Sequence, residues 1–275
     1  MDAARRFAII GSLVGIAPVV APVLGGLILT VGVWRDVFFV LTAVGVLLFA
    51  AALLGVPETL PPERRSGSSL HETHRRILDL LGDTRFMGFV VTGSLVTAAI
   101  FAYVVSSTFV MQRVYGLSAE QYTLFFAVNS VCLVLGGLIF RQLVGRVRVR
   151  SLLLFGLSLS TSAIVAAVLV QVLGGTPPLW LIWVLLALVL GGMGFNNPSF
   201  VTLSQRAGRR APGTAAALQG GFQFLIGAAL TPLGGLFGVA SPAPMLFLIG
   251  AFLVAAFLTN RLQGVLQRER LRELD

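Results

Sequence analysis

The residues that could hold a ligand are neutral polar side chains that interrupt long apolar stretches of the sequence. An amide or hydroxyl group in apolar surroundings needs a hydrogen-bond partner, and a cavity that binds a small molecule can supply one. Gln219 and Gln223 stand one helical turn apart beside Phe222, which suits an apolar cavity with a few polar groups. For each candidate taken singly, a hydrogen bond between helices is the alternative. The candidates for a substrate cavity are Tyr103, Ser106, Asn129, Asn196, Gln219 and Gln223.

Residues typical of enzymes and metal sites are scarce. The only two histidines, His71 and His74, stand in one charged segment, whereas zinc sites usually need three or four ligands. The single cysteine, Cys132, lies in an apolar stretch, so no disulfide can form within the chain. Ser-His-Asp chemistry would need a histidine among the apolar stretches, and they contain none. The sequence therefore predicts no catalytic residue, no metal ligand, no cofactor and a protein that is not an enzyme.

The composition argues against a soluble globular protein. Of the 275 residues, 56% are hydrophobic and 11% are charged, whereas soluble domains carry about 25% charged residues. The net charge is +9, every basic residue is arginine, and the arginines stand at the ends of apolar stretches. This placement indicates membrane topology and gives no support for nucleic-acid binding. Six stretches lack Asp, Glu, Lys and Arg: 7–34, 37–57, 86–112, 121–140, 151–205 and 211–260.

These stretches predict an all-α, polytopic fold with eight transmembrane helices. A helix needs about 20 apolar residues to cross a bilayer, so four of the stretches hold one span each. The two longest hold two each, because Gly174–Pro178 and Ser241–Pro244 interrupt them with helix-breaking residues. If both termini are cytoplasmic, 18 of the 20 arginines fall on the cytoplasmic side, in agreement with the positive-inside rule.

The longest connection between apolar stretches divides the chain into unequal parts. Residues 1–57 hold two spans, residues 58–85 form a cytoplasmic loop, and residues 86–260 hold six spans. Residues 261–275 then form a cytoplasmic tail.

The central loop contains the sequence pattern of a short helix. Ser69–Glu72 reads as a capping box, and Leu70, Ile77, Leu78 and Leu81 recur as one helical stripe. The stripe predicts an amphipathic helix on the cytoplasmic face of the membrane. A solvated linker explains so short a stripe equally well.

The first span carries the most unusual motif of the chain. Pro18 and Pro22 are four residues apart, so both interruptions of the helix fall on one face. The pair Gly25–Gly26 follows and permits close contact with a neighbouring helix. A bent, tightly packed helix of no special function is the alternative.

This segment resembles the antiporter signature in the fifth helix of major facilitator drug exporters. Alanines, prolines and glycines fill the pattern at Ala17, Pro18, Ala21, Pro22, Gly25 and Gly26. Later segments resemble, more narrowly, the bicyclomycin-resistance (Bcr/CflA) drug:proton antiporters. These segments are Trp34–Phe38, Pro57–Leu60, Phe101–Tyr103, Val114–Ser118 and Phe126–Asn129.

The resemblance implies an N-terminally truncated transporter that corresponds to family helices five to twelve. It implies efflux of small, largely apolar drugs or metabolites by proton antiport with alternating access. The partners would be a small-molecule substrate, protons and the lipid bilayer, without nucleic acid, and the protein would be a monomer. It would lie in the bacterial plasma (inner) membrane as a multi-pass protein with both termini cytoplasmic.

Proton coupling is the part of this interpretation that the residues do not support. The eight predicted spans lie in stretches without Asp or Glu. A proton relay needs ionisable groups among the helices. The family's first-helix acidic residues would belong to the four helices before Met1. We expect the reading frame upstream of Met1 to encode about four further spans. The alternative is a non-transporting major facilitator remnant or a membrane interaction protein.

Overall fold

Helices make up the regular structure of this protein. The computed structural model describes residues 24–28, 30–55, 70–230 and 241–272. Within these ranges, the sole exception to helical pairing is an isolated bridge between Val144 and Val147 in a tight loop.

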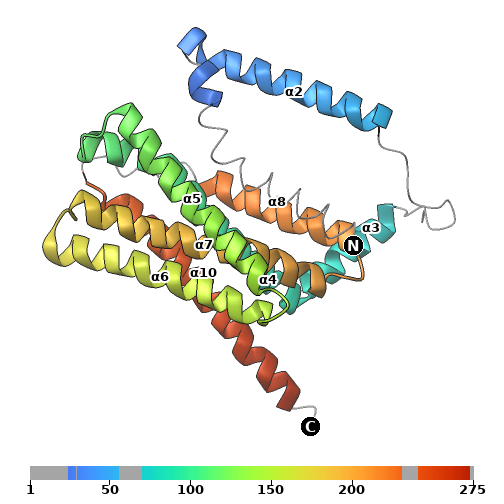
Figure 1. The fold of residues 1–275 in the computed structure, drawn as a ribbon. Coiled ribbons are helices and arrows are strands. Elements are labelled where there is room, and N and C mark those ends of the chain that lie inside the picture. Colours follow the sequence, from blue (N-terminus) through green and yellow to red (C-terminus); the bar gives the residue numbers. More distant parts are fainter. Residues whose placement is uncertain (1–23, 29, 56–69, 231–240, 273–275) are drawn as a thin grey trace. The chain divides into compact units, whose positions relative to one another are not determined.

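The chain divides into two compact units, Met1–Glu72 and Thr73–Asp275. The first unit contains α2 (Trp34–Gly55), an apolar helix whose charged residues stand in its first turn. A short helix, α3 (Leu70–Gly82), begins at the boundary. The second unit holds the other helices drawn in Figure 1, namely α4 (Thr84–Phe109) with the π-helix η2 (Val110–Val114), α5 (Ala119–Leu143), α6 (Val149–Gly174), α7 (Leu179–Ala207), α8 (Pro212–Leu230) and α10 (Ala243–Arg272).

Among the described residues, six helices are long and apolar enough to cross a membrane. They are α2, α4 with η2, α5, α6, α7 and the first part of α10. Most of the predicted first span lies outside the described residues. The remaining predicted span corresponds to α8, which has 19 described residues and is made less apolar by two glutamines. The prediction of an all-α, polytopic membrane protein is therefore confirmed.

The central loop contains the helix α3. The sequence analysis had two alternatives for this segment, an amphipathic helix and a solvated linker. Leu80 points inward and is 7% exposed, whereas Leu78 and Leu81 of the predicted stripe are exposed. The proposed capping residue Ser69 lies outside the described residues. Exposed leucines on a short polar helix are suited to contact with lipid headgroups and the upper parts of acyl chains. The location of α3 on the membrane surface stays a prediction.

Local signals in the sequence begin and end the helices of the second unit. Asp83 separates α3 from α4, and its carboxylate accepts hydrogen bonds from the backbone N–H groups of Arg85 (2.8 Å) and Phe86 (3.1 Å). Ser118 and Gln121 form a reciprocal capping box at the start of α5. Gly175 follows α6 with φ of 80°, a conformation that side chains other than glycine rarely adopt.

Glycines allow α7 to pack closely against both α5 and α6, which lie on either side of it (Figure 1). A Cβ atom added at Gly194 of α7 would lie 2.9 Å from the Cα atom of Gly136 in α5. One added at Gly156 of α6 would lie 2.6 Å from the carbonyl oxygen of Gly192 in α7. These contacts fix the register of three helices, and the polar residues on them are positioned accordingly.

Candidate functional site

The predicted polar residues do not form a single hydrogen-bonded cluster in the described structure. Five of them belong to two separate regions of the second unit. Tyr103, Ser106 and Asn129 lie on α4 and α5, whereas Gln219, beside the end of α7, and Gln223 lie on α8.

One polar contact between α4 and α5 joins two buried side chains. Asn129 donates a hydrogen bond from Nδ2 to the hydroxyl oxygen of Tyr103, at 3.0 Å. Tyr103 is 2% exposed and Asn129 is 0% exposed. The ring of Tyr103 also stacks on Phe126, with ring centroids 6.0 Å apart and planes inclined by 15°. An aromatic wall and an amide therefore face one another inside the helix bundle.

Two polar atoms beside this pair have no hydrogen-bond partner among the described residues. They are the Oδ1 atom of Asn129 and the hydroxyl of Ser106, which lies about one turn after Tyr103. A buried polar atom without a partner is destabilising by about 1–3 kcal/mol, so water or a bound molecule at this place would stabilise the fold. These two unpaired atoms are candidate contacts for the polar groups of a small molecule.

Tyr122 extends the same region, and the sequence analysis did not select it. Its hydroxyl lies 3.0 Å from Ser107 Oγ and accepts a hydrogen bond from Thr108 at 2.9 Å. The ring is 6.0 Å from that of Phe126. Tyr122, Phe126 and Asn129 follow the spacing of one helical face, so periodicity along α5 could have identified Tyr122.

The second polar region joins the end of α7 to α8. The hydroxyl of Ser204 is hydrogen-bonded to Oε1 of Gln219, and both residues are buried. Gln223, one turn later, is half-buried, and its Nε2 atom has no partner among the described residues. The α8 helix packs against α4, where the rings of Phe101 and Phe224 lie 6.3 Å apart. Ser204 is a further residue that the sequence analysis missed.

Asn196 occupies a different environment from the other candidates. It is 0% exposed on α7, and its Oδ1 atom lies directly against Gly156 of α6. Neither side-chain polar atom has a partner among the described residues. This position, within the close contact of α6 and α7, favours the alternative of a residue that packs helices together.

Only the end of the predicted antiporter motif can be placed. Ala17, Pro18, Ala21 and Pro22 lie outside the described residues. At Gly25 and Gly26, an added Cβ atom would meet no other atom within 4 Å. The predicted contact of these glycines with a neighbouring helix therefore stays a prediction.

Comparison with known proteins identifies the family. The model of the Major Facilitator Superfamily matches residues 2–232. The chain is 32% identical to an uncharacterized MFS-type transporter, YdgK, of Bacillus subtilis, over 86% of this chain and 58% of the relative. It is 29% identical to a bicyclomycin resistance protein homolog of Haemophilus influenzae, over 90% of this chain and 63% of the relative.

A further relative is the multidrug transporter MdfA of Escherichia coli, which is 27% identical over 77% of this chain and 51% of the relative. The chain thus spans between half and two thirds of the length of these relatives. The family match covers most of the chain, and the described helices are those of a polytopic membrane protein. The chain belongs to the Major Facilitator Superfamily.

Proposed function

We propose that this chain is part of a transporter that exports small, largely apolar drugs or metabolites across the bacterial plasma membrane. The observation that carries the proposal is the similarity to relatives named for bicyclomycin resistance and multidrug transport. The family and the polar residues both favour transport, so we assign the chain no enzymatic activity.

We place the substrate beside the buried pair of Tyr103 and Asn129, with Gln219 and Gln223 as a second set of contacts. The first region combines the stacked rings of Tyr103 and Phe126 with two polar atoms, Asn129 Oδ1 and the Ser106 hydroxyl, that have no partner among the described residues. Such a surface suits a mostly apolar molecule that carries one or two polar groups. In this proposal Asn196 has a structural role.

The transport cycle that we propose is alternating access with proton exchange. Two parts of the transporter would rock about a site near the middle of the membrane. The uncharged stretches of this chain contain no carboxylate, so we assign proton coupling to none of its residues. In this cycle the coupling carboxylates would come from helices outside the chain.

A flux assay tests the proposal. The longest reading frame that contains this chain is produced in bacteria, and ethidium accumulation is followed in inverted membrane vesicles with an imposed pH gradient. We expect gradient-dependent accumulation, which Gln219→Ala and Gln223→Ala should change without an equal change in protein abundance. If the product inserts correctly in the membrane but gives no flux, the second candidate function is favoured. In that case the protein is a remnant that keeps the fold and does not transport.

A further inference from the structure

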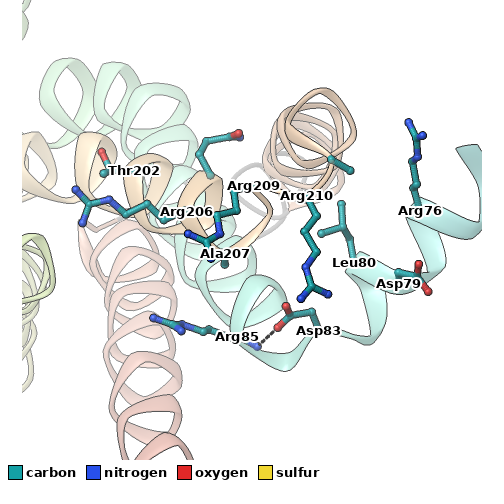
Figure 2. A pocket seen from close by; sticks show the side chains of 12 residues that line it. Arg76, Asp79, Leu80, Asp83, Arg85, Thr202, Arg206, Ala207, Arg209 and Arg210 are labelled. Carbon is teal, nitrogen blue, oxygen red and sulfur yellow. Dashed lines mark hydrogen bonds between the residues drawn. The ribbon is translucent and has the colours of Figure 1, made fainter. Parts of the chain in front are cut away.

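A large charged cavity lies outside the proposed substrate region, at one end of the second unit. Its volume is about 1320 Å³, and it opens between α3, the start of α4 and the turn that joins α7 to α8 (Figure 2). Five arginines and two aspartates line it, which gives a net charge of +3. The charged residues are Arg76, Arg85, Arg206, Arg209, Arg210, Asp79 and Asp83.

The arginines come from separate elements that a buried apolar cluster holds together. Leu80 of α3, Phe86 and Val90 of α4 and Ala215 of α8 form this cluster. Gly208 makes the turn after α7 tight, since an added Cβ atom there would lie 2.5 Å from the Cβ of Ala215. The backbone around the cavity is therefore closely packed, although the arginine side chains themselves are exposed.

One of the two aspartates already has partners in the backbone. Asp83 already caps α4, and its carboxylate accepts hydrogen bonds from two backbone N–H groups. Arg210 extends toward it in Figure 2. Arg206, Arg209 and Arg210 stand close together on one short segment, and a bound anion would relieve the repulsion among their guanidinium groups. Guanidinium groups match phosphate oxygens in shape as well as in charge.

The position of the cavity identifies the source of such an anion. Two helices that are long and apolar enough to cross a membrane begin and end here, at Thr84 and Ala207, and we expect the ends of such helices to lie near the lipid headgroups. On the neighbouring α3, Leu78 is 53% exposed and is available to acyl chains. Basic pockets at the cytoplasmic ends of membrane helices attract anionic lipids.

We propose that this cavity binds the phosphate headgroup of an anionic phospholipid, with Arg206, Arg209 and Arg210 as its main contacts. The proposal depends on the membrane location of the chain and is independent of drug export. The competing explanation is that these arginines only keep their loop on the cytoplasmic side, as the positive-inside rule describes, and bind no lipid.

Native mass spectrometry of the purified 275-residue chain tests the proposal. The protein is released from nanodiscs made of equal parts phosphatidylglycerol and phosphatidylcholine, and the retained lipid is counted. The triple variant Arg206→Gln, Arg209→Gln, Arg210→Gln is compared with Arg141→Gln, Arg146→Gln, Arg148→Gln. The control removes the same charge from three exposed arginines around the α5–α6 loop, on the same predicted side of the membrane.

The wild type and the control should each retain phosphatidylglycerol, and the cavity variant should lose it. The expected weakening is about fivefold for each arginine removed. Single variants at Arg206 and Arg209 provide the same comparison if the triple variant does not fold. Equal retention in all variants, or equal loss in the cavity variant and the control, would overturn the proposal.

A second measurement separates lipid from free anion. The thermal midpoint of the detergent-solubilised chain is recorded with short-chain phosphatidylglycerol, with short-chain phosphatidylcholine and with inorganic phosphate. Stabilisation by phosphatidylglycerol alone is the expected result, and replacement of the three arginines by lysine should preserve part of it because the charge is kept. Equal stabilisation by inorganic phosphate would assign the cavity to a soluble anion and contradict a lipid site.

Discussion

At the scale of single residues, Asn129 is the most informative position. Asn129→Ala removes the amide that donates to the Tyr103 hydroxyl, so that this hydroxyl loses its partner. The loss of one buried hydrogen bond should lower stability by about 1 kcal/mol. If the amide also contacts substrate, as we propose, the drug resistance of cells that produce the longest reading frame containing this chain should change by more than the abundance of the protein does.

Ser160→Ala is the matched control for this experiment. Ser160 is equally buried and donates a hydrogen bond to the carbonyl oxygen of Val189, at 2.8 Å, between α6 and α7. Its loss should reduce abundance and resistance in proportion. The same proportional loss in Asn129→Ala would assign Asn129 to helix packing and remove it from the substrate site.

Tyr115, in the turn after η2, should make stability sensitive to alkaline pH. Its hydroxyl donates to the carbonyl oxygen of Pro177, at 2.8 Å, and burial raises the pKa of Tyr115 to about 12 from its usual 10.0. The folded protein therefore keeps a proton that the unfolded chain loses above pH 10. Its contribution to stability is complete below that pH and is lost as the pH rises toward 12.

Tyr115→Phe checks this assignment, because phenylalanine has neither the hydrogen bond nor the titration. The thermal midpoint in detergent should be lower than that of the wild type at pH 8, and the difference should shrink between pH 10 and pH 11.5. A constant difference across this range would show that the phenol does not titrate differently in the folded protein.

At the scale of helices, Gly136 and Gly137 of α5 differ in how closely they approach α7. An added Cβ atom at Gly136 would overlap the backbone of Gly191 and Gly194, whereas one at Gly137 would lie 3.7 Å from its nearest neighbour. Alanine favours helix over glycine by about 1 kcal/mol. Gly137→Ala should therefore raise the thermal midpoint or leave it unchanged, while Gly136→Ala should lower it. Equal effects of the two substitutions would mean that α5 and α7 do not meet in this register.

The sequence predicts helices better than it predicts contacts between them. Uncharged runs of sufficient length mark α4, α5, α6 and α7, because the requirement for about 20 apolar residues is local. The break at Gly174–Pro178 is equally local and matches the end of α6 and the start of α7. The short stripe in α3 is too weak to distinguish a helix from a linker.

Contacts between helices depend on register, which a single sequence does not show. Tyr103 and Asn129 are 26 residues apart and meet only because α4 and α5 are joined by a turn of fixed geometry. The arginine cavity brings Arg85 close to residues more than 100 positions later in the chain. From the sequence these arginines are identified only as markers of the cytoplasmic side.

At the scale of the whole molecule, the orientation predicted from 18 of 20 arginines can be tested across a single helix. The α6 helix has 26 residues, which corresponds to about 39 Å at 1.5 Å per residue, and the apolar core of a bilayer is about 30 Å thick. Val147 and Thr176 are exposed at opposite ends of this helix. They should therefore lie on opposite sides of the membrane, with Val147 in the cytoplasm.

Single cysteines at these two positions, in a Cys132→Ala background, provide the test. In intact cells, a membrane-impermeant maleimide should label Thr176→Cys and spare Val147→Cys, because the arginine-rich loop around Val147 stays inside. Permeabilised cells should label both, which controls for reactivity. The reverse pattern in intact cells would invert the topology, and it would also place the arginine cavity on the outer face. Labelling of both sites in intact cells would show that α6 does not cross the membrane as one span.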